Sequence, residues 1–278
     1  MNELKRDYPV QLLSETLSIA RSSYYYEPQV VDERDLLAAV EQDLMQHPYH
    51  GYRRVTAQLQ RLGWSVGTTR IRRILQQLGH SRSVGRVRIQ TTDSLHPHGR
   101  YPNRIQGLTL HRPDELWVAD ITYIRYGFRF WYLAIVLDAY TRQVRGWALS
   151  RSLDRFLAVA ALQMALTNTV PLLFHSDQGV QYASFEHTAL LLAQGVTISM
   201  SDTGQPTQNG IAERFIRTLK EEHVDYSDYD DFDDAQHQLV HWLMHVYNTQ
   251  RIHSALDYLT PAEFEVQALA QNPYPILN

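Results

Sequence analysis

Three acidic residues have the types and spacing needed to hold divalent cations. Asp120 lies in a β-rich run, Asp177 follows the apolar run 170–174, and 35 residues separate Asp177 from Glu213. Two divalent ions about 3.5–4 Å apart can activate a nucleophilic oxygen, stabilise a leaving oxygen and neutralise a phosphate. Mg²⁺ prefers oxygen ligands and keeps several waters, so three carboxylates suit it. Metal-dependent phosphodiester chemistry therefore fits these three residues.

Hydrophobic periodicity predicts the elements that must position these acids. The run 170–174 has the length of a buried strand, with Asp177 just past its end. A helix from about 184 to 194, a strand at 196–199 and a helix from about 209 follow. On this last helix Ile211, Phe215 and Leu219 form a buried ridge, and Glu213, Arg217 and Lys220 share the opposite face.

The preceding segment predicts the first strands of the same sheet. LWVADITYIRY, FRFWYLAIVLDAY and QVRGWALS are β-rich runs, and a helix from Asp154 to about Thr167 follows them. Strands followed by alternating helices and strands indicate an α/β fold with a mixed, five-stranded sheet covered on both faces. Asp120 shares a strand face with apolar residues, so it must be paired, protonated or bound to a metal. Asp138 is a rival carboxylate, although Arg142 four residues later favours a turn-stabilising pair.

The charge distribution indicates a polyanionic partner for the N-terminal part. The net charge is −4, but residues 50–112 hold twelve Arg and one acid, whereas residues 113–278 hold ten basic and twenty acidic residues. Within 51–80, a helix, a Gly turn and a second helix rich in Arg are what a major-groove reader needs; a helical adaptor is the alternative. The candidate DNA-binding residues here and in the following basic segment are Arg53, Arg54, Arg70, Arg72, Arg73, Arg86 and Arg88.

Composition excludes several other classes of protein. The chain has no Cys, which excludes a disulfide scaffold, a Cys-ligated zinc and a thiol nucleophile. It shows no signal peptide and no apolar stretch of membrane-spanning length, so we expect an intracellular protein. Near the C-terminus, Thr260-Pro261-Ala262-Glu263 predicts a capped helix start. Arg251 and His253 before it could contact DNA or pair with acids of the core.

Five motifs in order give the chain a family resemblance. HGYRRVTAQL, WVADITYI with YLAIVLDAYTRQVRGWALS, HSDQGVQYAS, PTQNGIAERFIRTLKEE and YNTQRIHSALDYLTPAEF cover most of the chain. Together they resemble the catalytic (OrfB-type) subunit of bacterial insertion-sequence transposases, with a retroviral-integrase-type Asp-Asp-Glu core. The sequence departs from the pattern at Gln208-Asn209-Gly210, where many members have Asp-Asn-Ala, and at Asp202, which has no counterpart in it.

The resemblance implies a ribonuclease-H-like core that cleaves the terminal inverted repeats of a mobile element and joins them to target DNA. Asp120, Asp177 and Glu213 would be both the catalytic and the metal-binding residues, holding two Mg²⁺ ions for which Mn²⁺ can substitute. Asn209, Arg217 and Lys220 would contact double-stranded DNA. It also implies a homo-oligomer on DNA, an upstream (OrfA-type) product as partner or fusion, no membrane, and a cytoplasmic, nucleoid-associated location.

Five segments are expected from these patterns. They are an N-terminal helical segment with a candidate helix-turn-helix (1–45), a helix-turn-helix-like module (46–95), a basic linker (96–112), the catalytic core (113–225) and a C-terminal helical extension (226–278). Two rival functions stay open. One is a DNA-binding repressor with an inactive core, and the other is a ribonuclease-H-like nuclease that only hydrolyses.

Overall fold

The computed structural model describes residues 7–25, 33–80, 101–202 and 205–271, and the chain forms two compact units, 1–46 and 47–278. The first unit contains the helices α1 (Val10–Thr16), α2 (Arg21–Tyr24) and α3 (Arg34–Gln46). Leu13 in α1 and Leu36 and Val40 in α3 are buried. Helix α2 is only four residues long, about one turn. It is therefore shorter than the recognition helix that a helix-turn-helix places in the major groove.

The second unit begins with two helices joined by a Gly-containing turn, as the sequence predicts. They are α4 (Tyr52–Arg61) and α5 (Thr68–Gln77). Val55, Leu59 and Ile71 are buried between them, but Leu62 is 67% exposed. Leu62 lies outside the helix because α4 ends at Arg61 and Gly63, at φ 89°, turns the chain away.

A mixed sheet of five strands forms the centre of the second unit. Its strands are β1 (Leu116–Tyr126), β2 (Arg129–Asp138), β3 (Val144–Ser150), β4 (Leu173–Ser176) and β5 (Thr197–Met200), in the order β3-β2-β1-β4-β5. The first three strands pair antiparallel, and β4 pairs parallel with both β1 and β5. This confirms the predicted mixed sheet.

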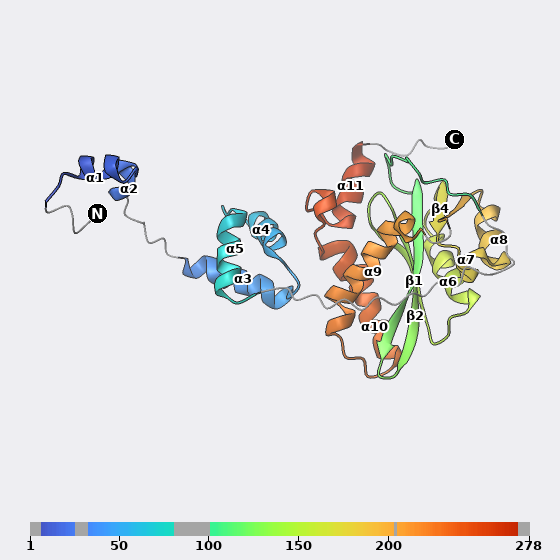
Figure 1. The fold of residues 1–278 in the computed structure, drawn as a ribbon. Coiled ribbons are helices and arrows are strands. Elements are labelled where there is room, and N and C mark those ends of the chain that lie inside the picture. The colour runs from blue at the N-terminus through green and yellow to red at the C-terminus, as the bar shows by residue number, and fades with distance from the viewer. Residues whose placement is uncertain (1–6, 26–32, 81–100, 203–204, 272–278) are drawn as a thin grey trace. The chain divides into compact units, whose positions relative to one another are not determined.

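Helices cover both faces of the sheet, as Figure 1 shows. One face packs against α9 (Gly210–Glu222), α10 (Phe232–His241) and the π-helix η4 (Trp242–Gln250). The other packs against α6 (Arg155–Ala165), α7 (Val180–Ala183) and α8 (Phe185–Ala193). Two-sided burial explains why β2 is apolar almost throughout. The remaining helices are α11 (Pro261–Gln271) and the short η2 (Pro206–Asn209), η3 (Val224–Tyr226) and η5 (Ser254–Leu256).

Strand β4 lies further along the chain than its apolar run predicts. The run 170–174 includes Leu172, which is 56% exposed, whereas the observed strand extends to Ser176. Pairing decides the position: β4 meets β1 from Leu173 onward and β5 up to Ser176. The neighbouring strands therefore set the boundaries, and hydrophobicity alone misplaced them.

Asp138 stabilises a turn, as predicted, but mainly through backbone groups. Its carboxylate accepts hydrogen bonds from the backbone N–H groups of Asp114, Tyr140 and Thr141 at 2.5–2.9 Å. The predicted partner Arg142 contributes its backbone N–H to the Asp138 carbonyl oxygen. Asp138 is fully buried, so it is a structural acid of the β2–β3 turn.

The predicted cap of the C-terminal helix is confirmed. The Thr260 N–H donates to Glu263 Oε2 at 2.9 Å, and the Glu263 N–H donates to Thr260 Oγ1 at 3.2 Å. These two reciprocal bonds form a capping box with Pro261 at the first helical position. Across the described segments, every helix is too short or too polar to cross a lipid bilayer.

Candidate active site

The sheet register brings Asp120 and Asp177 to the same level. Strands β1 and β4 run parallel, and Val118 pairs with His175. Two residues further along each strand direction stand Asp120 and Asp177. Neighbouring strands lie about 4.8 Å apart, so the two carboxylates occupy adjacent positions where β4 ends.

Helix α9 supplies the third acid. Glu213 lies in its first turn and is exposed, while Phe215 and Leu219 seat the helix on the sheet. Just before the helix, the Asn209 Nδ2 group donates to the Ala119 carbonyl oxygen at 3.0 Å. This buried bond ties the start of α9 to β1 beside Asp120.

The three acids interact electrostatically. Burial raises the pKa of Asp120 well above its usual value, and the charges of Asp177 and Glu213 raise it further. A hydrogen bond from the Ile121 N–H and the charge of Lys220 only partly oppose this rise. The carboxylate oxygens of the three acids are not all within 4.8 Å of one another. The acids therefore form an open, mutually repelling group, and a cation between them would relieve the repulsion.

Two residues that the sequence reasoning missed adjoin Asp177. The Gly179 N–H donates to Asp177 Oδ1 at 2.9 Å, and a Cβ on Gly179 would lie 2.9 Å from the same oxygen. Only glycine therefore leaves this carboxylate undisturbed. The hydroxyl of Tyr182 is buried without a hydrogen-bond partner in the described residues, and burial, Asp120 and Asp177 raise its pKa. Glycine two residues after a strand-end acid was the available signal for the first of these.

A buried histidine supports the strand that leads to Asp177. His175 Nδ1 lies 2.9 Å from Ser199 Oγ and its Nε2 lies 3.0 Å from Ser201 Oγ. Burial lowers the pKa of His175 to about 4, so the ring is neutral near pH 7. Its two bonds join β4 to β5 and fix the level at which β4 delivers Asp177.

The predicted basic residues of α9 differ in exposure. Arg217 is exposed, and the described residues give it no ion pair with Glu213 or Glu221. Lys220 is half-buried; burial lowers its pKa, which the charges of Asp225 and Asp120 oppose. Lys220 therefore lies close enough to the acids to sense Asp120.

The predicted DNA-binding arginines of the N-terminal part differ in how exposed they are. Arg53, Arg72 and Arg73 are exposed and Arg70 is half-buried. Arg86 and Arg88 lie outside the described residues. The exposed group is consistent with a surface that meets DNA.

Two residues expected at DNA have contacts inside the protein instead. Asn209 is 4% exposed and holds β1 as described above. The Arg54 Nη1 group donates to Glu222 Oε1 at 2.8 Å. Arg251, for which DNA and an acid of the core were both open, also binds Glu222, with Nε 2.7 Å from Oε2. In this conformation these side chains stabilise the fold.

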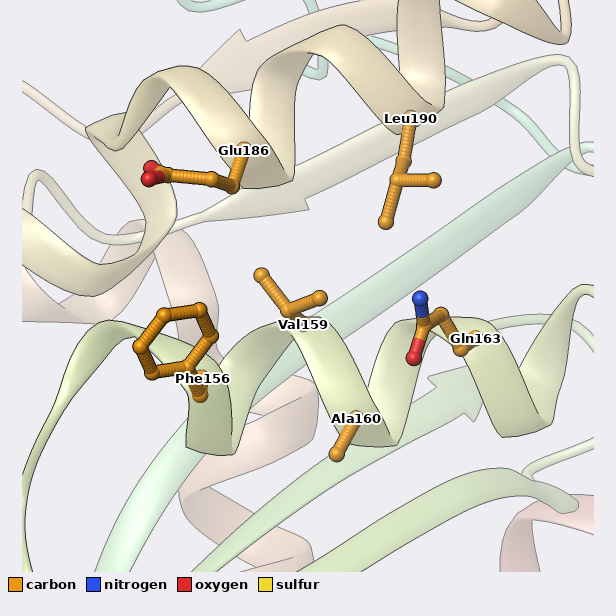
Figure 2. Close-up of a pocket in the computed structure, with 6 residues that line it drawn as sticks. All are labelled: Phe156, Val159, Ala160, Gln163, Glu186 and Leu190. Atoms are coloured by element: carbon orange, nitrogen blue, oxygen red, sulfur yellow. The ribbon is translucent and has the colours of Figure 1, made fainter.

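Figure 2 shows a pocket between α6 and α8. It is lined by Phe156, Val159, Ala160, Gln163, Glu186 and Leu190. None of these residues is one of the three acids, and the lining is mostly apolar. The chemistry suggested by the sequence therefore belongs to the acidic group on β1, β4 and α9.

Known protein families match three stretches of the chain. Families described as "Integrase core domain" match residues 110–206 and 194–261, and one described as "HTH-like domain" matches residues 31–88. The first two stretches contain all three acids, and the third contains α4 and α5. An integrase-type core and a DNA-binding domain are thus present in one chain.

Curated relatives identify the family. "Transposase for insertion sequence element IS904" from Lactococcus lactis subsp. lactis is 30% identical over 220 residues, covering 78% of this chain and 87% of the relative. "Insertion element IS600 uncharacterized 31 kDa protein" from Shigella sonnei is 30% identical over 263 residues, covering 91% and 97%. "Putative transposase InsK for insertion sequence element IS150" from Escherichia coli is 28% identical over 277 residues, covering 96% and 97%. The chain belongs to the insertion-sequence transposases with an integrase core.

This membership defines the class of chemistry. Integrase-type cores are polynucleotidyl transferases that bind divalent metal ions, and the HTH-like domain makes DNA the partner. Among solved structures, a simian T-cell lymphotropic virus intasome in complex with PP2A regulatory subunit B56 gamma has a TM-score of 0.49 at 18% identity, covering 86% of this chain and 76% of that one. The HTLV-2 integrase catalytic core domain in complex with magnesium (dimeric form) has a TM-score of 0.43 at 17% identity, covering 55% and 97%.

Proposed function

We propose that this transposase uses Asp120, Asp177 and Glu213 to cleave the ends of its mobile element and to join them to target DNA. The observation that carries the proposal is the convergence of the three acids from β1, β4 and α9. At this place the charges of Asp177 and Glu213 make Asp120 harder to ionise and raise its pKa. A fold does not need three repelling carboxylates at the end of a sheet. Such an arrangement is typical of a cation site.

The residues present fit divalent magnesium. The donors are hard carboxylate oxygens, and the buried Tyr182 hydroxyl near Asp120 and Asp177 offers a further polar group. Asp120, Asp177 and Glu213 together would hold the ions. Bound there, two Mg²⁺ or Mn²⁺ ions would lower the pKa of a nucleophilic hydroxyl and neutralise charge on the phosphate.

The protein's own residues have distinct roles around this centre. Gly179 and His175 set the position of Asp177, and Asn209 sets the start of α9 relative to Asp120. Arg217 and Lys220 supply positive charge on the α9 surface beside the acids, where a DNA phosphate backbone would lie. The site contains no protein nucleophile in this scheme, so cleavage and joining use the same acids in turn.

The N-terminal module selects the DNA. The exposed Arg53, Arg72 and Arg73 of α4 and α5, with Arg70, would contact the terminal inverted repeats. We propose that the chain divides into five segments, with boundaries after residues 45, 95, 112 and 225. We also infer that the enzyme works as a homo-oligomer on DNA in the cytoplasm. An upstream OrfA-type product would add a further DNA-binding segment, either separately or as a fusion.

Conservative substitution of each acid tests the proposal. Asp120→Asn, Asp177→Asn and Glu213→Gln should each abolish cleavage and strand transfer on duplexes carrying the element's ends with Mg²⁺, while end binding stays near wild type. Glu186→Gln removes one negative charge from α8, where Glu186 pairs with Arg155 on the surface, and it should retain activity.

The outcomes also separate the rival functions. If the wild-type protein yields hydrolysed ends but no joined-strand products, the protein is a nuclease that only hydrolyses. If it binds a specific sequence but does not nick DNA when metal is added, it is a repressor. Wild-type cleavage by any of the three acid variants would show that the acid concerned has been assigned wrongly.

A further inference from the structure

The turn between β1 and β2 carries exposed aromatic and basic side chains. The ten residues 123–132, YIRYGFRFWY, include six aromatic residues, two arginines and no acid. Phe128 is 104% exposed and Phe130 is 45% exposed. Arg125 and Arg129 are exposed as well. We call residues 125–130 the hairpin tip.

Folding does not explain this composition. The hairpin gains its stability from Ile124 and Trp131, which are buried, and Gly127 at φ 54° makes the turn. In the described part of the chain neither tip arginine takes part in an ion pair, and the Arg125 Nε group only donates to the Gly127 carbonyl oxygen at 3.4 Å. Two exposed phenylalanines and two exposed arginines grouped within six residues form a patch of the kind found where a protein contacts a partner.

The hairpin tip is held on a rigid base. The rings of Tyr126 and Trp131 stack with centroids 4.3 Å apart, and Trp131 meets Phe232 of α10 edge-on at 5.4 Å. The Tyr126 hydroxyl donates to the Asp230 carbonyl oxygen at 2.7 Å. A fixed base means that little conformational entropy is lost when the tip binds.

The tip extends beyond the acids in the direction in which β4 ends. Strand β1 runs parallel to β4, and Tyr126 lies six residues after Asp120. At about 3.3 Å per residue the tip reaches about 20 Å from Asp120, the length of about 6 base pairs of duplex. Figure 1 shows the β1–β2 hairpin projecting past the shorter strands of the sheet.

We propose that the hairpin tip binds the duplex DNA flanking the scissile phosphate, about 6 base pairs from it. This proposal rests on the proposed function of the acids. Arg125 and Arg129 contact phosphates, and Phe128 packs in the minor groove, where apolar side chains can wedge between base steps. Residues 113–278 hold twenty acids and ten basic residues, so the acid-free tip with its two arginines contrasts in charge with the rest of this part of the chain.

The two sides of the hairpin tip differ in their surroundings. The acidic segment 228–234 lies against the Tyr126 and Trp131 side through Tyr229 and Phe232. Arg125 and Phe130 are paired across the strands on the other side. Arg129 pairs with Tyr126 and so starts on the acidic side of the ribbon, whereas Arg125 starts on the other side. Both arginine side chains are exposed at the turn, so the two can contact the phosphates of a duplex that lies across Phe128.

A series of duplex lengths tests the proposal on the full-length protein. The probes are duplexes with the element's terminal sequence, extending about 3, 6 or 10 base pairs beyond the scissile phosphate on either side. The triple variant Arg125→Ala, Phe128→Ala, Arg129→Ala should bind the longer duplexes about tenfold more weakly, with a shallower salt dependence. Both proteins should bind the shortest duplex equally. Phe185→Ala, which removes an aromatic ring that is 79% exposed on α8, is the matched control and should match wild type.

Two results would overturn the proposal. Equal affinities of wild type and triple variant at every length would show that the tip does not touch DNA. A triple variant that sediments as a smaller species while keeping the wild-type length dependence would assign the tip to a second copy of the chain. Because binding is measured without metal, failure of the acids to catalyse would be seen separately, in the cleavage assay.

Discussion

A single buried carboxylate, Glu222, should determine the stability of the second unit. It is the last residue of α9, nine residues after Glu213, and its side chain is 1% exposed. Arg251 binds it with Nε 2.7 Å from Oε2 and Nη2 2.8 Å from Oε1, and the Arg54 Nη1 group lies 2.8 Å from Oε1. Glu222 thereby joins α9 to α4 and to the segment after η4.

The substitution Glu222→Gln should lower the free energy of unfolding by about 3–5 kcal/mol. Removing one partner of a buried ion pair leaves the opposite charge without compensation, and here the side chains of Arg251 and Arg54 are only 8% and 15% exposed. His253 cannot take over: burial and Arg251 lower its pKa to about 2, so it is neutral and its Nε2 already accepts from Arg251 Nη1.

The protein contains a matched control whose arginine lies on the same helix as Arg54. Arg61 of α4 pairs with Glu263 at 2.6 Å, but their side chains are 36% and 42% exposed. Glu263→Gln should therefore cost less than about 1 kcal/mol. Urea denaturation followed by tryptophan fluorescence measures both substitutions, with cleavage of element ends as a second readout.

The dependence on pH gives an independent check. Burial raises the pKa of Glu222, but the hydrogen bonds and charges of Arg251 and Arg54 outweigh it and lower the pKa below 4.5. The contribution of Glu222 is thus complete above pH 4.5 and is lost as the pH falls through the folded-state pKa. The difference between wild type and Glu222→Gln should shrink in that range. Equal costs for the two glutamate substitutions would refute the reasoning, and so would a difference that does not shrink anywhere in the acid unfolding of the wild type.

Two further predictions concern glycines and basic residues near the site. Gly179→Ala should lower cleavage strongly with little change in stability, since its Cβ would displace the Asp177 carboxylate and the end of the Gln181 side chain but no backbone atom. Gly146→Ala should cost about 3 kcal/mol because its Cβ would lie 2.2 Å from a backbone oxygen of α6. Thermal melting and cleavage rates compare the two variants, and a loss of activity that follows the loss of stability in both would contradict this prediction. The double variant Arg217→Ala, Lys220→Ala should reduce the rate of single-turnover cleavage at saturating DNA and Mg²⁺ without lowering the melting temperature. If the variant cleaves and binds the element's ends like wild type, Arg217 and Lys220 are ordinary surface charges.

The sequence alone determined the features that depend on neighbours along the chain. The strand-forming run around Asp120, the ridge of α9 and the capping box at Thr260 are local patterns whose period or spacing follows from backbone geometry. The spacing of Asp177 and Glu213 belongs to the same group. Composition also divided the chain into an Arg-rich part and an acidic part, and this division indicated where DNA would bind.

Only the tertiary structure decided which distant residues meet. The pairing of β1 with β4 put Asp120 level with Asp177 and moved the boundaries of β4 away from its apolar run. Arg54, expected at DNA, bonds instead to Glu222, 168 residues away, and Asn209 bonds to the backbone of Ala119. An arginine or an asparagine has the same local signature whether it faces DNA or a buried acceptor. Its partner is fixed by how helices and strands pack, because a buried polar group must find a hydrogen bond wherever the fold supplies one.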